Sequence, residues 1–194
     1  MTRTPERLAR VNRVLDNRQP DLRVVLEEIT NAHNANAVLR TCDAAGILHV
    51  DIIGSDPTPL LINGAVTTRA DKWLKIHQYP NAGECYGPLR AAGFQIAATH
   101  LGEGAIPYTS LDYSKPTAIV FGNEHDGLSA AAREHADVLI KIPMFGMVQS
   151  LNLSVSVGII LYEAVRQRLS RGFFDGRRLS PEEFENTLDG WLDL

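Results

Sequence analysis

One segment in the last third of the chain constrains the fold most strongly, because it joins a strand, a turn and a long apolar helix. Residues 138–142 form a short apolar run that predicts a buried strand. Pro143 and Gly146 then mark a turn. Residues 151–161 are apolar almost all round, which indicates a helix that is buried on most faces. We take this unit as the one around which the rest of the chain is organised.

The turn before this helix carries three polar side chains within four positions: Gln149, Ser150 and Asn152. The start of a helix presents free N–H groups and the positive end of the helix dipole. Serine and asparagine are preferred N-caps, so one of these residues is explained by capping alone. Because a cap needs only one such residue, the other two favour a binding site at this helix start.

The remaining chain alternates short apolar runs with amphipathic periods. Strands are expected at 22–29, 49–53, 73–79, 94–99 and 117–121, and helices at 5–17, 34–46, 81–92, 129–136, 151–169 and 181–192. Residues 54–71 show no clear period and predict a long loop, and Ser180 to Glu183 form a capping box. Strands that alternate with helices predict an α/β fold with a mostly parallel sheet.

Composition limits the class of protein. The 194 residues are 44% hydrophobic, enough for one compact domain with extensions. The sequence has neither a run of apolar residues long enough for a membrane span nor a secretory signal at its start. Cys42 and Cys85 lie far apart in unlike contexts and predict reduced thiols, so we expect a cytoplasmic protein. The six histidines are scattered, which argues against a zinc site.

Charge is distributed unevenly along the chain. The net charge of −4 speaks weakly against a nucleic-acid partner, but residues 1–18 hold five arginines and residues 175–194 are acidic. This asymmetry is typical of a nucleic-acid arm, although composition alone favours a solvated helix face.

Glycine occurs in three loops that follow predicted strands, at 99–104, 122–127 and 143–150. Ligands of open parallel sheets bind beyond the carboxyl ends of the strands, where these loops lie. The chain contains no GxGxxG, P-loop or GxSxG pattern, which argues against dinucleotide, phosphate-loop and nucleophile-elbow sites.

The candidate chemical groups are few. Arg40 lies on a helix of otherwise small or apolar residues that begins near Asn34, and Glu124 follows a strand end. Arg40 is equally consistent with an ion-pair partner, and Glu124 with a carboxylate at a helix N-terminus. Ser150 has no His–Asp pair nearby in sequence. These side chains can position a substrate and stabilise charge, but they include neither a strong nucleophile nor a group of metal ligands.

Three segments resemble the motifs of a known family. Residues 34–46 (NANAVLRTCDAAG), 121–129 (FGNEHDGLS) and 142–155 (IPMFGMVQSLNLSV) are similar to the three motifs of the SPOUT methyltransferases, SpoU branch. The similarity covers about residues 20–165. It implies a sheet with helices on both faces, a deep C-terminal trefoil knot, and a homodimer with the active site near its interface. It also implies S-adenosylmethionine held by six residues: Thr99, Leu101, Gly122, Ile142, Met147 and Leu151.

The resemblance implies that five residues act in ribose 2′-O-methylation: Arg40, Asn34, Glu124, Ser150 and Asn152. Arg40 would grip a phosphate and stabilise alkoxide charge, and Asn34 would orient Arg40 or the substrate. Ser150 and Asn152 would hold cofactor and arginine, and Glu124 would fix the loop geometry. No metal is required.

The chain ends also resemble a subgroup of this family. The extensions at 1–19 and 170–194, around a catalytic domain at 20–169, are similar to those of members that methylate guanosine 18 of tRNA. We expect Arg7, Arg10, Arg13 and Arg40 to contact the RNA. The alternatives are a methyltransferase acting on the tRNA wobble ribose or on ribosomal RNA, and a catalytically silent RNA-binding dimerisation module.

Overall fold

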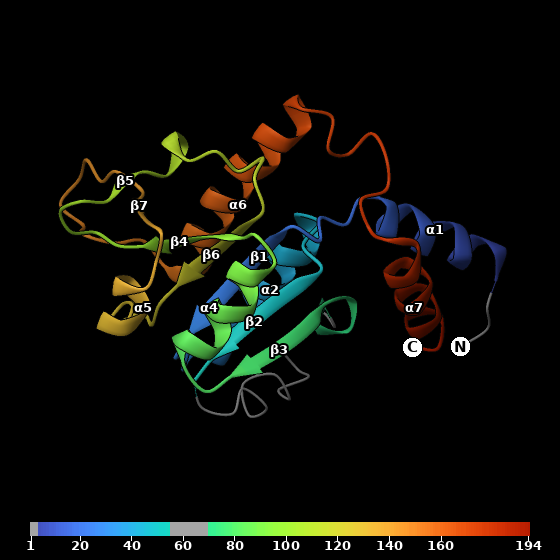
Figure 1. The fold of residues 1–194 in the computed structure, drawn as a ribbon, viewed down its shortest axis with the longest axis horizontal. Coiled ribbons are helices and arrows are strands. Elements are labelled where there is room, and N and C mark those ends of the chain that lie inside the picture. The colour runs from blue at the N-terminus through green and yellow to red at the C-terminus, as the bar shows by residue number, and fades with distance from the viewer. Residues whose placement is uncertain (1–3, 55–69) are drawn as a thin grey trace.

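The computed structural model describes residues 4–54 and 70–194 and contains one seven-stranded sheet (Figure 1). The strands are β1 Leu22–Glu27, β2 His49–Ile53, β3 Lys75–Tyr79, β4 Gln95–Thr99, β5 Ile106–Pro107, β6 Thr117–Phe121 and β7 Val138–Lys141. Their order is β3-β2-β1-β6-β4-β7-β5, and neighbouring strands are parallel throughout. The predicted α/β class with a mostly parallel sheet is therefore confirmed.

Helices connect these strands. They are α1 Pro5–Asp16, α2 Ala32–Ala44, α4 Ala82–Ala91, α5 Ala130–Glu134, α6 Leu153–Ser170 and α7 Pro181–Leu192, with short 3-10 turns η1 at Ala70–Trp73 and η2 at Tyr108–Ser110. No helix within 4–54 or 70–194 is long and apolar enough to cross a membrane.

The central strands are buried on both faces because helices cover each side of the sheet. Val24 belongs to a core formed with α2 and α6, whereas its neighbour Val25 belongs to a second core formed with α4 and α5. Successive side chains of a strand point to opposite faces, so one continuous apolar strand serves both cores. This explains why β1 and β6 contain continuous apolar stretches, at 24–26 and 118–121.

Helices α1 and α7 form a separate pair beside the sheet (Figure 1). Their contact is a third apolar cluster that includes Val11 and Leu15 of α1 and Phe184 and Trp191 of α7. The apolar face of the last helix therefore packs on the first helix.

Two fully buried arginines, one after α1 and one on α6, bond to segments that lead into the sheet, and sequence analysis missed both. Arg18 forms an ion pair with Asp43 and donates to the carbonyl oxygen of Ile47 at 2.6 Å. Arg168 contacts Asp21 at 2.5 Å. Burial works against the charge of Asp21, but hydrogen bonds from Arg168 and Arg178 outweigh it and hold the Asp21 pKa below its ordinary value. Arg18, counted above in the arginine-rich arm, is therefore a structural residue.

Several predicted boundaries differ from the structure. Helix α2 begins at Ala32, not Asn34, because the Asn31 side chain accepts from the N–H groups of His33 and Asn34 and caps the helix earlier. The capping box of α7 is half formed: Ser180 accepts from the Glu183 N–H, but the Glu183 carboxylate bonds to His49 and Lys75. Strand β5 and turn η2 lie in a segment expected to be loop. Residues 55–69 of the predicted 54–71 loop lie outside the described residues.

Candidate active site

A cavity of about 440 Å³ lies at the carboxyl ends of β4, β6 and β7. All three glycine-containing loops contribute to it, as their positions after the strands predict. Its volume is typical of a small-molecule or cofactor site. Of the residues with predicted roles, it is lined by Thr99, Leu101, Gly122, Glu124, Ile142, Ser150 and Leu151.

The middle loop follows β6 and folds back on itself. A Cβ atom at Gly122 would lie 2.3 Å from the carbonyl carbon of Gly127, so only glycine allows this close approach of backbone to backbone. The backbone of Asn123 pairs with that of Gly127 in both directions, at 2.9 and 3.0 Å. The loop therefore presents Glu124 from a tightly closed turn.

Glu27 fixes the far end of the same loop. Its buried carboxylate accepts from the Ser129 N–H at 2.8 Å and from the Ser129 hydroxyl at 2.7 Å. Sequence analysis missed this residue, although a carboxylate inside an apolar strand was the available signal, because a buried charge requires partners.

A chain of hydrogen bonds joins the three sequence motifs. The Asn34 side-chain amide donates to Glu124 Oε1 at 2.7 Å, and the Asn152 amide donates to Asn34 Oδ1 at 3.1 Å. Asn34 lies on α2, Glu124 follows β6, and Asn152 precedes α6. Segments that are distant in sequence are thus held at one place by side chains.

Asn152 serves both functions that its position suggested. It is the N-cap of α6, where its Oδ1 accepts from the Ser154 N–H at 2.8 Å. Its Nδ2 remains available and donates to Asn34. An alanine at this position would remove the helix cap and the link between motifs together.

One oxygen of Glu124 is the most informative atom of the site. Glu124 Oε2 is buried and has no hydrogen-bond partner among the described residues. Buried polar atoms are normally paired, so an unpaired carboxylate oxygen on a cavity wall indicates a ligand with a donor group. With the tight Gly122 backbone and the cavity volume, this fits a polar cofactor such as S-adenosylmethionine.

Arg40 lies apart from the hydrogen-bonded chain of Asn34. Within the described residues the Asn34 amide group bonds to Glu124 and Asn152 and not to Arg40, and the expected role of Asn34 in orienting Arg40 or the substrate stays a prediction. Arg40 is exposed, lies outside the cavity lining and forms no hydrogen bond with any described residue. It follows Asn34 by six residues of helix, which places the two side chains on different sides of α2.

The other residues that were predicted to contact cofactor or RNA also lie outside the cavity. The Met147 side chain is 99% exposed and does not line the cavity. Arg10 and Arg13 are exposed on α1, whereas Arg7 donates to the Trp191 carbonyl oxygen at 2.9 Å and so joins α1 to α7. Within 4–54 and 70–194, no group of three or more His, Cys, Asp and Glu side chains could hold a metal ion.

Known proteins share this architecture and these motifs. The chain is 45% identical over 193 residues to the tRNA (guanosine(18)-2'-O)-methyltransferase of Thermus thermophilus, covering 98% of this chain and 97% of that relative. The crystal structure of the A. aeolicus TrmH/SpoU tRNA modifying enzyme matches with a TM-score of 0.91 and 41% identity, over 97% of this chain and 95% of that one. The AdoMet-bound rRNA methyltransferase from Sinorhizobium meliloti matches with a TM-score of 0.69 and 34% identity, over 79% of this chain and 59% of that one.

The model of the SpoU rRNA Methylase family matches residues 21–162, which contain the whole sheet and all three motifs. Together with the near full-length relatives, this shows that the chain belongs to the SpoU rRNA Methylase family.

Proposed function

We propose that this chain methylates the ribose 2′-oxygen of guanosine 18 in tRNA, with S-adenosylmethionine as the methyl donor. The observation that carries the proposal is the hydrogen-bonded chain of Asn34, Glu124 and Asn152 at the edge of a cofactor-sized cavity. The substrate is supported by relatives from Thermus thermophilus and A. aeolicus, which match both terminal helices as well as the catalytic domain. We place the activity in the cytoplasm, where tRNA is available.

The cofactor would supply an electrophilic methyl group at the cavity. The unpaired Glu124 Oε2 is positioned to accept from it, and Thr99, Leu101, Gly122, Ile142 and Leu151 would surround it. Holding donor and ribose in one orientation contributes a large part of the rate enhancement, because a reaction between two bound groups avoids the entropy loss of an encounter. Ser150 lines the same cavity and would contact the cofactor or the ribose.

Arg40 would act on the RNA side of the reaction. A guanidinium remains protonated at neutral pH, so it is unsuited to remove the proton of the ribose hydroxyl. Its planar fork can instead bind a phosphate through two hydrogen bonds and stabilise the negative charge that develops on the ribose oxygen. Arg40 is exposed on α2 and has no partner in the part of the chain that the structure describes, which supports contact with RNA.

A second copy of this chain would complete the site. Val155, Tyr162 and Leu169 are spaced by seven residues along α6, and their side chains are 48%, 52% and 58% exposed. Phe145, in the preceding turn, is 97% exposed. An apolar stripe of this kind on a core helix is typical of an interface. Because α6 packs against α2, this interface would lie near Arg40 and the cavity.

Light scattering tests the dimer. The expected mass is twice the 21.3 kDa of the chain. Tyr162→Asp should shift the mass to that of the monomer, because it places a charge in the apolar stripe. Leu8→Asp alters another exposed apolar residue, on α1, and should leave the dimer intact. A monomeric wild type would contradict the proposed interface.

We infer further that the 142–152 segment forms the trefoil knot of this family, and that residues 20–169 carry the chemistry while the terminal helices hold the RNA. Calorimetry with S-adenosylmethionine, followed by methyl transfer to a tRNA transcript in the presence of a chelator, tests the activity. We expect binding and metal-independent transfer. A protein that binds tRNA but neither binds the cofactor nor transfers methyl groups would be a silent RNA-binding module instead.

A further inference from the structure

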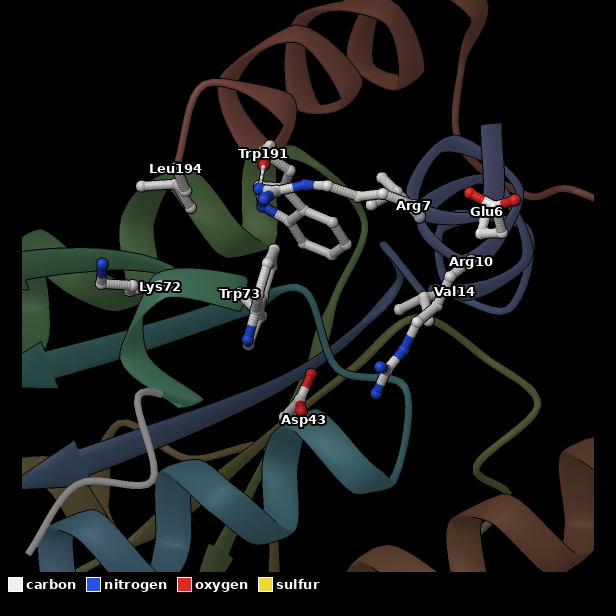
Figure 2. Close-up of a pocket in the computed structure, with 10 residues that line it drawn as sticks. Glu6, Arg7, Arg10, Val14, Asp43, Lys72, Trp73, Trp191 and Leu194 are labelled. Atoms are coloured by element: carbon white, nitrogen blue, oxygen red, sulfur yellow. Dashed lines mark hydrogen bonds between the residues drawn. The ribbon is translucent and has the colours of Figure 1, made fainter. Parts of the chain in front are cut away.

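A second cavity, of about 530 Å³, lies between α1, α7 and the end of α2 (Figure 2). Arg10 reaches into it from α1, and Trp73 forms part of the opposite wall. Trp191 lies against Trp73 in an edge-to-face arrangement with ring centroids 5.2 Å apart. The cavity is thus bounded by aromatic rings on one side and by an arginine helix on the other.

Only some of the charged side chains around this cavity have an ion-pair partner among the described residues. Asp43 lines it, but its carboxylate is already paired with the buried Arg18. Arg10 and Lys72 also line it, and neither forms a hydrogen bond or ion pair with any described residue. Glu6 is the remaining carboxylate of the lining. The walls therefore present two cations without a described partner, Arg10 and Lys72, beside the partly exposed ring of Trp73.

The position of this cavity relative to Arg40 is set by a single helix. Asn34, in the hydrogen-bonded chain of the active site, and Asp43, in the second cavity, both belong to α2. Nine residues of helix separate them by about 14 Å. Arg40 precedes Asp43 by three residues, so the two side chains lie on the same side of α2. A polyanion that contacts Arg40 therefore has this cavity within reach.

We propose that this second cavity binds an unpaired nucleotide of the tRNA, with its base against Trp73 and its phosphate between Arg10 and Lys72. This rests on the proposed function. Single-stranded nucleic acid is bound by the same combination of aromatic surfaces and cationic grooves. The site would hold the RNA at one end of α2 while the ribose is methylated at the other.

The two tryptophans of the chain both lie at this cavity, so intrinsic fluorescence reports on it directly. In a Trp191→Phe protein, Trp73 is the only tryptophan, and excitation at the red edge of its absorption avoids the five tyrosines. Titration with a five-nucleotide single-stranded RNA should quench it in a saturable way. Arg10→Ala and Lys72→Ala, introduced separately in this background, should each raise the Kd about tenfold. Arg90→Ala removes the same charge from an exposed position on α4, outside the cavity, and should leave the Kd within twofold.

Methyl transfer to whole tRNA provides the second readout. Trp73→Ala should raise the KM for tRNA about tenfold, within the range for loss of one base–aromatic stack, and leave kcat unchanged. Trp73→Phe should remain within threefold of wild type, because phenylalanine preserves a stacking surface.

Three results would overturn the proposal: no quenching of Trp73 by RNA, equal losses for Arg10→Ala and Arg90→Ala, or equally tight quenching by a free mononucleotide. Wild-type transfer to guanosine 18 separates this from the proposed function. If transfer occurs without any Trp73 response, only the second site is wrong. If the wild type transfers no methyl group to tRNA, the proposed function itself fails.

Discussion

The segments that lead into the sheet and the outer side of α2 use arginine in opposite ways. Beside those segments, Arg18 after α1 and Arg168 on α6 are fully buried, and each is paired with a carboxylate. On the outer side of α2, Arg40 is exposed and has no partner among the described residues. Burial of a charge requires a fixed partner, whereas an exposed charge remains available to a ligand. The first group therefore stabilises the fold, and in the proposed function the second contacts the substrate.

The largest expected effect concerns the buried group. Arg168→Ala should lower the free energy of unfolding by about 3–5 kcal/mol, because it leaves the Asp21 carboxylate without its main partner. Urea unfolding measures this. Arg171→Ala, in which a largely exposed ion pair with Asp112 is lost, should change it by less than about 1 kcal/mol. Equal effects of the two substitutions would remove the distinction between structural and available arginines.

Asn34→Ala should disturb the cavity more than the fold. It leaves Glu124 Oε1 and the Asn152 amide without their bonds, at a cost of about 1–3 kcal/mol. We expect S-adenosylmethionine affinity, measured by calorimetry, to fall about tenfold. Asn36→Ala is the control, because the Asn36 side-chain amide donates to the Ala32 carbonyl oxygen of its own helix and to no other described residue. Unchanged cofactor affinity in Asn34→Ala would show that the chain of amides is not part of the cofactor site.

A smaller effect concerns pH. Hydrogen bonding to His49 and Lys75 lowers the Glu183 pKa to about 2. Because this pKa lies below the unfolded value of about 4.3, the carboxylate adds stability above pH 4–5 and loses it as the pH falls toward 2. Glu183→Gln should lower the free energy of unfolding at pH 7 by about 1–2 kcal/mol, and the difference from wild type should vanish near pH 2.

Glu185→Gln alters an exposed carboxylate of the same helix and should stay within about 0.5 kcal/mol of wild type at every pH. A Glu183→Gln difference that does not change with pH would show that the ion-pair cluster does not fasten α7 to the sheet.

The outcome at individual residues shows which features sequence can predict. The strand bounds of β2 and β6 follow directly from their apolar runs, and the three glycine loops meet because parallel strands end at one edge. The burial of Arg18 was not predictable in this way, because its partner Asp43 is 25 residues away and only the tertiary fold brings them together.

The same limit applies to the site. The resemblance to the family motifs identified Asn34, Glu124 and Asn152, but the direction of each amide depends on helix rotation, so the hydrogen bonds among them could not be predicted. The second cavity could not be predicted from the sequence either. Trp73 and Trp191 are 118 positions apart and meet only because α7 packs on η1.

The central claim is that an exposed Arg40 assists transfer to a ribose oxygen of tRNA without supporting the fold. Single-turnover methylation at saturating tRNA, with mapping of the modified nucleotide, tests it most directly. We predict one 2′-O-methyl group at guanosine 18 with wild type, a rate at least about 100-fold lower with Arg40→Ala, and no recovery with Arg40→Lys, which lacks the planar fork. The Arg40→Ala unfolding free energy should stay within about 0.5 kcal/mol of wild type. Full activity of Arg40→Lys, unfolding of Arg40→Ala, or methylation at another nucleotide would contradict the account.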